Sequence, residues 1–212
     1  MKDRILYEWK MAGGGFFLMS AALSALLAAA SAASGGLPEL AAAGFEVVFP
    51  FYTAVAVGEW GKTRADGCFD VIAAQGRSLF RWAAARWASL FGAASAFAVL
   101  AMGFLGDGSL FGEMALLYFP TAFFFSSLCA LTGFVFRREH AAPLACGLLW
   151  LAALLARGLL RVPGVEYVYP FLRFAGGGFP VLLWNKGILT GAGLALWGIL
   201  YWRCRAFPSP AK

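Results

Sequence analysis

The chain has 212 residues, of which 61% are hydrophobic and 13% charged, and its formal net charge is +6. A soluble domain averages about 45–50% apolar and about 25% charged residues, so this chain has too few polar side chains to cover a water-exposed globule. The composition excludes a soluble globular protein and predicts an integral membrane protein. The excess of Lys and Arg is then expected on cytoplasmic loops, where these residues set the orientation, and not at a nucleic-acid interface.

Six apolar segments, each near the ~20 residues needed to cross a bilayer as a helix, are separated by polar or Gly- and Pro-containing stretches. Residues 1–11 have Ile, Leu and Trp among charged residues, which is typical of an interfacial helix lying on a membrane surface. The sequence therefore predicts an all-α integral membrane fold in a single domain, 1–212, with six transmembrane helices at 12–33, 40–58, 82–105, 114–136, 141–160 and 185–202.

The stretch 161–184, between the last two predicted spans, contains three prolines and a run of three glycines among aromatic and aliphatic residues. It is too interrupted to span the bilayer and too apolar to be a solvated loop. Irregular backbone is tolerated at membrane depth only where protein or water satisfies its polar groups. We therefore expect a short external re-entrant helical element here, packed on the fifth and sixth spans.

The basic residues are distributed unevenly between the two sides of the membrane. Thirteen of the 17 Lys and Arg residues fall in alternate polar segments, which are 1–10, 59–86, 137–140 and 203–212. By the positive-inside rule these segments face the cytoplasm. The expected location is the cell (inner or cytoplasmic) membrane, with several passes and both termini cytoplasmic.

Glu46 lies about seven residues into the second predicted span, where an acidic side chain costs roughly 2.5–3.5 kcal/mol on insertion scales. It lines a polar path or a subunit interface, or it sits at the headgroup level if the span begins later. Arg157 and Arg161, near the outer end of the fifth span, are candidate partners for Glu46. Alternatively, both arginines extend to the membrane interface.

The sequence offers no strong catalytic or metal-binding pattern. Gly61-Lys62-Thr63 matches the end of a phosphate-binding loop, but such a loop needs a glycine where this chain has Ala56, and a preceding strand. The four cysteines are far apart and lack metal-ligand spacing, so no metal site is expected. His140 lies in a polar turn and no serine lies in a nucleophile motif, so the chain is expected to be a non-enzyme without a cofactor of its own.

The stretch 59–86 is the longest segment that is neither apolar enough to span nor rich enough in Gly and Pro to be a plain loop. It contains five basic residues and joins the second and third spans. In its loop part, 59–81, Phe69 and Ile72 recur at helical spacing, which predicts a short amphipathic helix. A membrane protein would present such a helix to a soluble partner.

The order of these features resembles that of ABC-2-type permeases, the transmembrane subunits of ATP-binding-cassette exporters. Members have an N-terminal interfacial helix, six spans with both ends inside, a coupling helix in the first cytoplasmic loop, and a short re-entrant element between spans five and six. Their first loop has an acidic residue, a Gly-Thr-x-Glu motif, an apolar run, a Pro-containing turn and a basic residue. The corresponding residues here are Glu59, Gly67, Cys68, Asp70, the run 71–74, the turn 75–78 and Arg86, with Cys for Thr, Asp for Glu and Gly for the turn proline.

The resemblance implies that the chain is the permease subunit, with Glu46, Arg157 and Arg161 as candidates for lining the translocation path. ATP and Mg²⁺ would bind to a separate cytosolic ABC ATPase subunit, present in two copies. A second copy of this chain, or a homologous permease, would complete the exporter in the lipid bilayer. Phe69 and Ile72 would be the apolar anchors for the ATPase. The full set of expected coupling residues is Glu59, Gly67, Phe69, Asp70, Ile72, Arg77 and Arg81.

Two other classes of function compete with this interpretation. A substrate-binding membrane subunit of an uptake transporter can have a similar size and number of spans, but it would lack the long basic loop 59–86. A polytopic membrane enzyme or protease would need clustered His, Asp or Ser at membrane depth, and the sequence has no such cluster.

Overall fold

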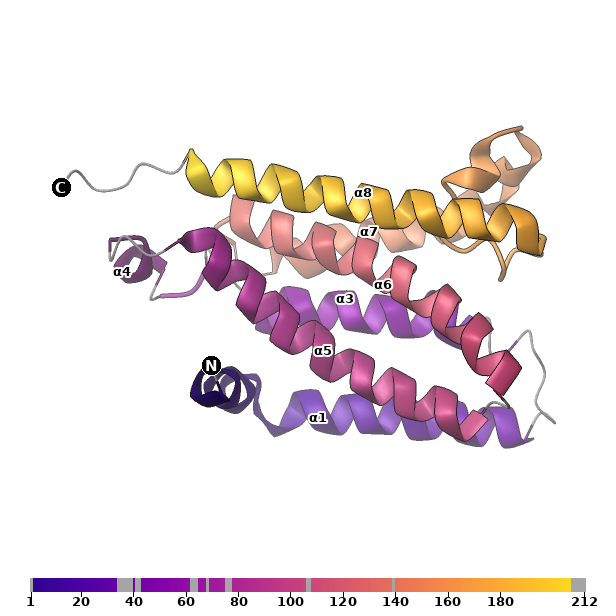
Figure 1. Cartoon of the computed structure of the whole chain (residues 1–212), viewed down its shortest axis with the longest axis horizontal. Coiled ribbons are helices and arrows are strands. Elements are labelled where there is room, and N and C mark those ends of the chain that lie inside the picture. Colours follow the sequence, from indigo (N-terminus) through magenta and orange to yellow (C-terminus); the bar gives the residue numbers. More distant parts are fainter. Residues whose placement is uncertain are drawn as a thin grey trace.

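The computed structural model describes residues 2–33, 40, 43–61, 65–67, 69–74, 78–105, 108–138 and 140–206. All secondary structure within these residues is helical, which confirms the predicted all-α fold. The long helices run along one common direction as a bundle (Figure 1). The elements are α1 (Lys2–Ala33), the π-helix η1 (Ala43–Val48), α3 (Phe49–Trp60), α4 (Phe69–Ala74), α5 (Leu79–Leu105), α6 (Gly108–Val135), α7 (Ala141–Leu155), the 3₁₀-helices η2 (Ala156–Arg161) and η3 (Val165–Tyr167), and α8 (Phe179–Arg205).

Among the described residues, four helices are long and apolar enough to cross a membrane by length and composition: Leu79–Leu105, Leu110–Val135, Ala141–Arg161 and Phe179–Arg205. They correspond to the third to sixth predicted spans. This result supports a multi-pass membrane protein. The first two predicted spans correspond to α1 and to the pair η1–α3, which do not meet the same criterion over the described residues.

Helix α8 begins at Phe179, several residues before the expected start of the sixth span at 185. Pro180 suggested a break in the chain, but it occupies the first turn of α8, where proline is tolerated because the missing N–H has no intrahelical partner. The consequence is that Lys186 lies about two turns inside a membrane-length helix instead of at its beginning.

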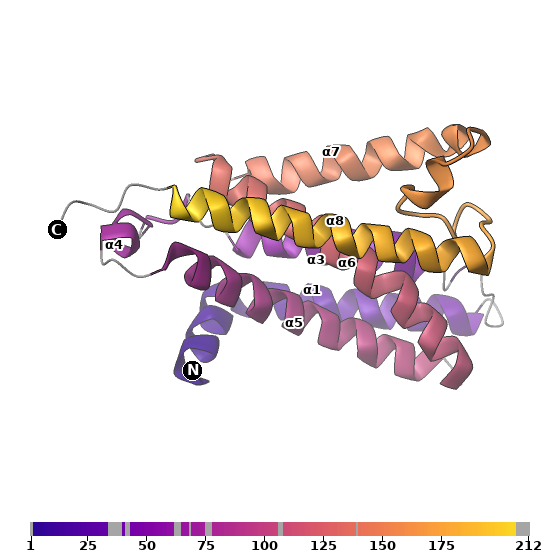
Figure 2. The same cartoon turned by 45° about the horizontal axis from the view of Figure 1, so that its top comes forward.

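Helix α1 is one continuous helix where the sequence predicts two elements, the interfacial helix 1–11 and the span 12–33. Figure 2 shows that the first turns of α1, at the N-terminus, point away from the direction of the rest of the helix. The helix is therefore continuous along the chain but bent in space.

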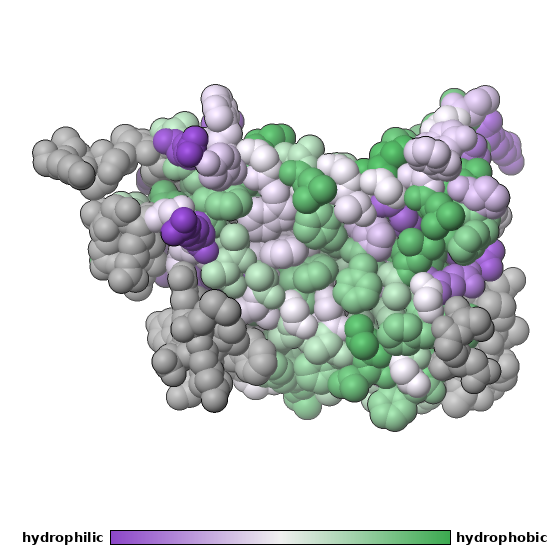
Figure 3. All heavy atoms as spheres, viewed as in Figure 1, coloured by the Kyte–Doolittle hydropathy of each residue, from purple (hydrophilic) through white to green (hydrophobic). Residues whose placement is uncertain are grey.

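Helix α7 lies at the edge of the bundle (Figure 2) and packs on α3 and α6. Only 6% of the most apolar part of the span Ala141–Arg161, which α7 forms together with η2, is buried, and the outward side chains of α7 include Leu144, Leu148, Leu151 and Leu155. On the face shown in Figure 3, hydrophobic residues cover the middle of the molecule and hydrophilic ones gather towards its two ends. This distribution fits a bundle surrounded by lipid.

The two ends of the bundle differ. At one end lie the start of α1, helix α4, the junction of α6 with α7, and the end of α8 (Figures 1 and 2). At the other end the chain between α7 and α8, residues 156–178, forms η2, η3 and a series of turns. This stretch contains the last residues of the fifth predicted span, 156–160, and overlaps the expected element at 161–184.

Candidate functional site

Glu46 lies in the π-helix η1 and its side chain is completely buried. A π-helical turn is rare, and such turns are frequently found at functional sites. The element directly precedes α3, which has Pro50 in its first turn. Other parts of the protein therefore enclose the carboxyl group of Glu46.

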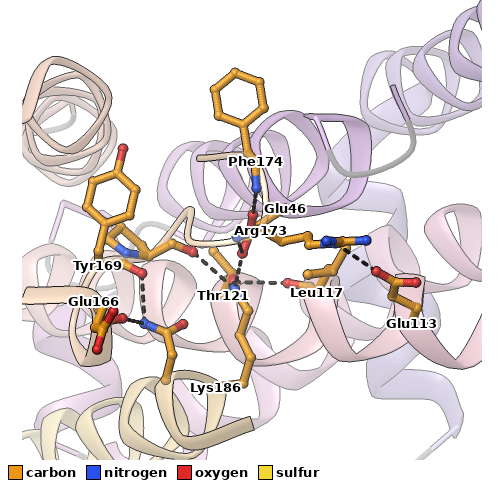
Figure 4. Close-up of polar contacts among 11 residues, drawn as sticks. Glu46, Glu113, Leu117, Thr121, Glu166, Tyr169, Arg173, Phe174 and Lys186 are labelled. Atoms are coloured by element: carbon orange, nitrogen blue, oxygen red, sulfur yellow. Dashed lines mark hydrogen bonds and ion pairs between the residues drawn. The ribbon is translucent and has the colours of Figure 1, made fainter. Parts of the chain in front are cut away.

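The partner of Glu46 is Lys186 of α8. The ammonium Nζ of Lys186 lies 2.6 Å from Glu46 Oε1, and the side chains are 1% and 0% exposed. Nζ also donates to Thr121 Oγ1 of α6 at 2.9 Å and to the carbonyl of Pro170 at 3.0 Å. A lysine ammonium has three donors, and here each has an acceptor from a different part of the chain (Figure 4).

The carboxylate of Glu46 also accepts two backbone N–H groups from the stretch between α7 and α8. The N–H of Arg173 donates to Oε1 at 3.2 Å and that of Phe174 donates to Oε2 at 2.7 Å. Both oxygens therefore have donors, and the buried pair is neutral overall. Such a pair is stable because each charge has a partner and additional hydrogen bonds.

Asn185, the neighbour of Lys186 on α8, holds the same stretch through its side-chain amide. Its Nδ2 donates to the carbonyls of Glu166 at 2.9 Å and Tyr169 at 2.8 Å. Its Oδ1 is buried without a hydrogen-bond partner among the described residues, as is the hydroxyl of Tyr169. Burial raises the pKa of Tyr169, and the positive charge of Arg157 partly offsets this rise.

Arg157 and Arg161 are not the partners of Glu46, contrary to the expectation from the sequence. The guanidinium of Arg157 lies 5.7 Å from the centre of the Phe174 ring, and Arg161 is exposed at the end of η2. At the rim of the buried cluster, Arg173 Nε pairs with Glu113 Oε1 at 2.9 Å, with side chains 40% and 29% exposed. Lys186 was missed as the partner because the sixth span was expected to begin beside it.

At the opposite end of the bundle, α4 is the amphipathic helix that the sequence predicts in the loop 59–81. Phe69 points inward and is 5% exposed. Its ring lies 6.3 Å from that of Trp82 on α5 and 6.1 Å from that of Phe134 on α6, centroid to centroid. Phe69 is thus a packing residue of this chain, whereas Val71 of α4 faces outward and is 57% exposed.

Among the described residues near α4 there is an ion pair with α5 and a hydrogen bond between α3 and the residue that precedes α7. Arg86 Nη1 of α5 lies 2.6 Å from Asp66 Oδ2, which fixes the turn before α4 to α5. Glu59 Oε2, in the last turn of α3, lies 3.2 Å from His140 Nδ1. The other expected coupling residues Gly67, Asp70 and Arg81 are exposed, while Arg77 and the side chain of Ile72 lie outside the described residues.

Neither end of the bundle has a metal centre among the described residues, since no three His, Cys, Asp or Glu side chains come together there. Comparisons with protein-family models, with curated proteins and with solved structures found no match to this chain. Its function is therefore argued from its own residues and geometry.

Proposed function

We propose that this chain is the membrane-spanning permease subunit of an ATP-binding-cassette exporter, which forms the translocation path and couples to a separate ATPase subunit. The observation that supports this proposal is the position of α4. It stands at the end of the bundle where α1 begins and α8 ends, outside the long helices (Figures 1 and 2). A helix in this position is available to a soluble partner.

In this proposal the chain crosses the membrane six times. The two crossings beyond the four membrane-length helices are α1, whose shorter apolar part is Gly14–Leu27, and the pair η1–α3, which together run from Ala43 to Trp60. Eighteen residues of helix span about 27 Å at 1.5 Å each, which is close to the thickness of the hydrocarbon core. The first turns of α1, which point away from the bundle, would lie on the membrane surface.

The exposed arginines support a cytoplasmic position for the end that presents α4. The exposed residues at this end include Arg81, Arg137, Arg138, Arg203 and Arg205. Lys and Arg are concentrated on the cytoplasmic side of membrane proteins. Both termini and α4 would then face the cytoplasm, where an ATPase is found.

The packing of Phe69 supports a mechanical role for α4. Phe69 belongs to a buried cluster with Leu79 and Trp82 of α5, Phe134 of α6, and Leu200 of α8. A displacement of α4 by a partner would therefore be transmitted to three long helices as rigid-body motion. Since Phe69 is buried, the residues of α4 that would contact the partner are Asp70 and Val71, which are exposed.

Capture of the ATPase by the full-length protein tests the proposal. We expect protein tagged at its C-terminus to co-purify with a soluble chain that hydrolyses ATP and contains a phosphate-binding loop. Substitution Val71→Asp should reduce captured ATPase activity by about tenfold or more, because it puts a charge into the apolar centre of the contact.

Val168→Asp is the matched control, since Val168 is 58% exposed but lies at the opposite end of the bundle. It should leave the capture unchanged. The proposal fails if no ATPase co-purifies, or if Val71→Asp and Val168→Asp reduce capture equally. An ATPase captured independently of α4 would instead favour the uptake-transporter alternative.

A further inference from the structure

Three buried side chains of other elements form hydrogen bonds with the backbone of residues 165–175. Five of its polar groups, the carbonyls of Glu166, Tyr169 and Pro170 and the N–H groups of Arg173 and Phe174, bond to side chains. The side chains that receive or donate these bonds are Glu46, Asn185 and Lys186, which are 0–1% exposed. The segment is therefore attached to the bundle through a compact polar cluster (Figure 4).

Glycines with unusual backbone angles lie at both ends of this segment. Among the described residues, a positive φ occurs only at Gly164, with 90°, and at Gly176, with 96°. Glycine adopts this region without the steric cost that a side chain brings. Hinges in proteins are formed by a few loop residues that absorb large changes in φ and ψ, and these two glycines have the place and the freedom to do so.

The inner side of the segment is apolar and hides residues of the long helices. Phe171 stacks on Phe125 of α6 with ring centroids 5.9 Å apart. Leu172 packs with Leu117 of α6 and Leu182 of α8, and all three are at most 3% exposed. If the segment moved away, Leu117 would lose part of its covering.

We infer that residues 165–175 form a hinged cover over this end of the bundle, and that Glu46, Asn185 and Lys186 form its latch. The apolar contacts under the cover are non-directional, whereas the latch depends on charge. Loss of one charge leaves the other buried without compensation, and lifting the cover relieves this cost because water then reaches the remaining charge. All Lys186 donors and both Glu46 oxygens are occupied within the chain, which is what a closed latch requires. The inference does not depend on an ATPase partner.

Thiol labelling tests the latch in full-length protein in proteoliposomes. A reporter cysteine is introduced as Leu117→Cys, and its reaction with a hydrophilic maleimide is followed residue by residue by mass spectrometry. With the native latch, the reporter should react slowly, since position 117 is 2% exposed. The added substitution Glu46→Gln should raise its labelling rate by about tenfold or more, because it leaves Lys186 without its charge partner.

Glu113→Gln is the matched control. It also removes an acidic group that contacts the segment 165–175, but it breaks only the partly exposed pair with Arg173, so the labelling rate should stay within about twofold. The native Cys129 and Cys146 lie in the core and are 1% and 0% exposed. They report on unfolding and should remain unreactive in every variant.

Three results would overturn the inference. In the first, the reporter is unaffected by Glu46→Gln. In the second, Glu113→Gln has an equal effect. In the third, Cys129 and Cys146 become reactive together with the reporter, which would make the ion pair a support of the whole fold and not a latch.

Discussion

At the scale of single residues, the buried ion pair decides how this end of the bundle is built. Lys186 meets acceptors from η1, α6 and the cover at once. Removing one partner of such a pair typically costs about 3–5 kcal/mol, while the intact pair adds little net stability over apolar residues. The pair therefore specifies which segments meet more than it strengthens the fold.

The buried side chain of Tyr118 in α6 forms a second polar contact between helices. Its hydroxyl lies 2.9 Å from Thr53 Oγ1 of α3 and 3.1 Å from Ser95 Oγ of α5, so it joins three helices. Tyr118→Phe should lower the free energy of unfolding by about 1–2 kcal/mol, since interhelical hydrogen bonds in membrane proteins contribute about 0.6 kcal/mol on average and up to about 1.7. Unfolding in mixed micelles measures the change.

Tyr201→Phe serves as the control for Tyr118→Phe, because Tyr201 is 40% exposed and its ring contacts with Phe80 and Arg205 are kept by phenylalanine. The control should change stability by less than about 0.5 kcal/mol. Equal effects of the two substitutions would show that the hydroxyl of Tyr118 does not join the helices.

At the scale of elements, α8 packs along α6. Two glycines of α8 distinguish the side that contacts α6 from a side that does not. Gly193 faces α6 so closely that a Cβ there would lie 2.6 Å from two ring carbons of Phe123 and 3.5 Å from the Cα of Phe124. A Cβ at Gly191, on the same helix, would have no atom within 4 Å. Small residues let membrane helices approach closely, and Gly193 has this role between α6 and α8.

The two glycines give a matched pair of substitutions. Gly193→Ala should destabilise the protein by about 1–3 kcal/mol, because the added methyl group pushes against Phe123. Gly191→Ala should be neutral or stabilising by up to about 1 kcal/mol, because alanine has the higher helix propensity. Comparing their unfolding in mixed micelles tests the packing of α8 on α6, and it would be contradicted if the order of stability were reversed.

At the scale of the whole molecule, the bundle has a cationic end and an end closed by the cover. The start of α1, α4 and the end of α8 share the first of these ends (Figure 1). Because this end holds exposed arginines from three regions of the chain, which are α5, the junction of α6 with α7, and α8, the positive-inside rule predicts that it faces the cytoplasm. The cover would then face outward.

Reporter fusions test this orientation. A fluorescent protein that folds only in the cytoplasm, fused after the C-terminus, should fluoresce. Alkaline phosphatase, active only outside, should be active when fused after Arg173 in the cover and inactive after Arg138 at the cationic end. The reverse pattern would contradict the orientation and remove the basis for a cytosolic partner of α4.

The all-helical fold and four helices of membrane length could be predicted from local patterns, and particular boundaries show why the rest could not. The start of α8 was misplaced because Pro180 acts as a breaker inside a helix but is neutral in the first turn, and only the neighbouring chain decides which applies. The direction of Phe69 was misjudged for a similar reason. A short amphipathic helix has an apolar face, but its sequence does not say whether that face meets its own chain or another protein.

Composition and hydrophobic length act locally, so they suffice to predict an apolar, all-α chain with an acidic residue, Glu46, within a predicted span. The folded structure alone reveals that Lys186 is the partner of Glu46 and that the irregular stretch before α8 is attached through them. Glu46 and Lys186 are separated by 140 positions. No local pattern links such distant residues, and the pairing follows only when α8, α6 and η1 pack together and leave each charge without access to water.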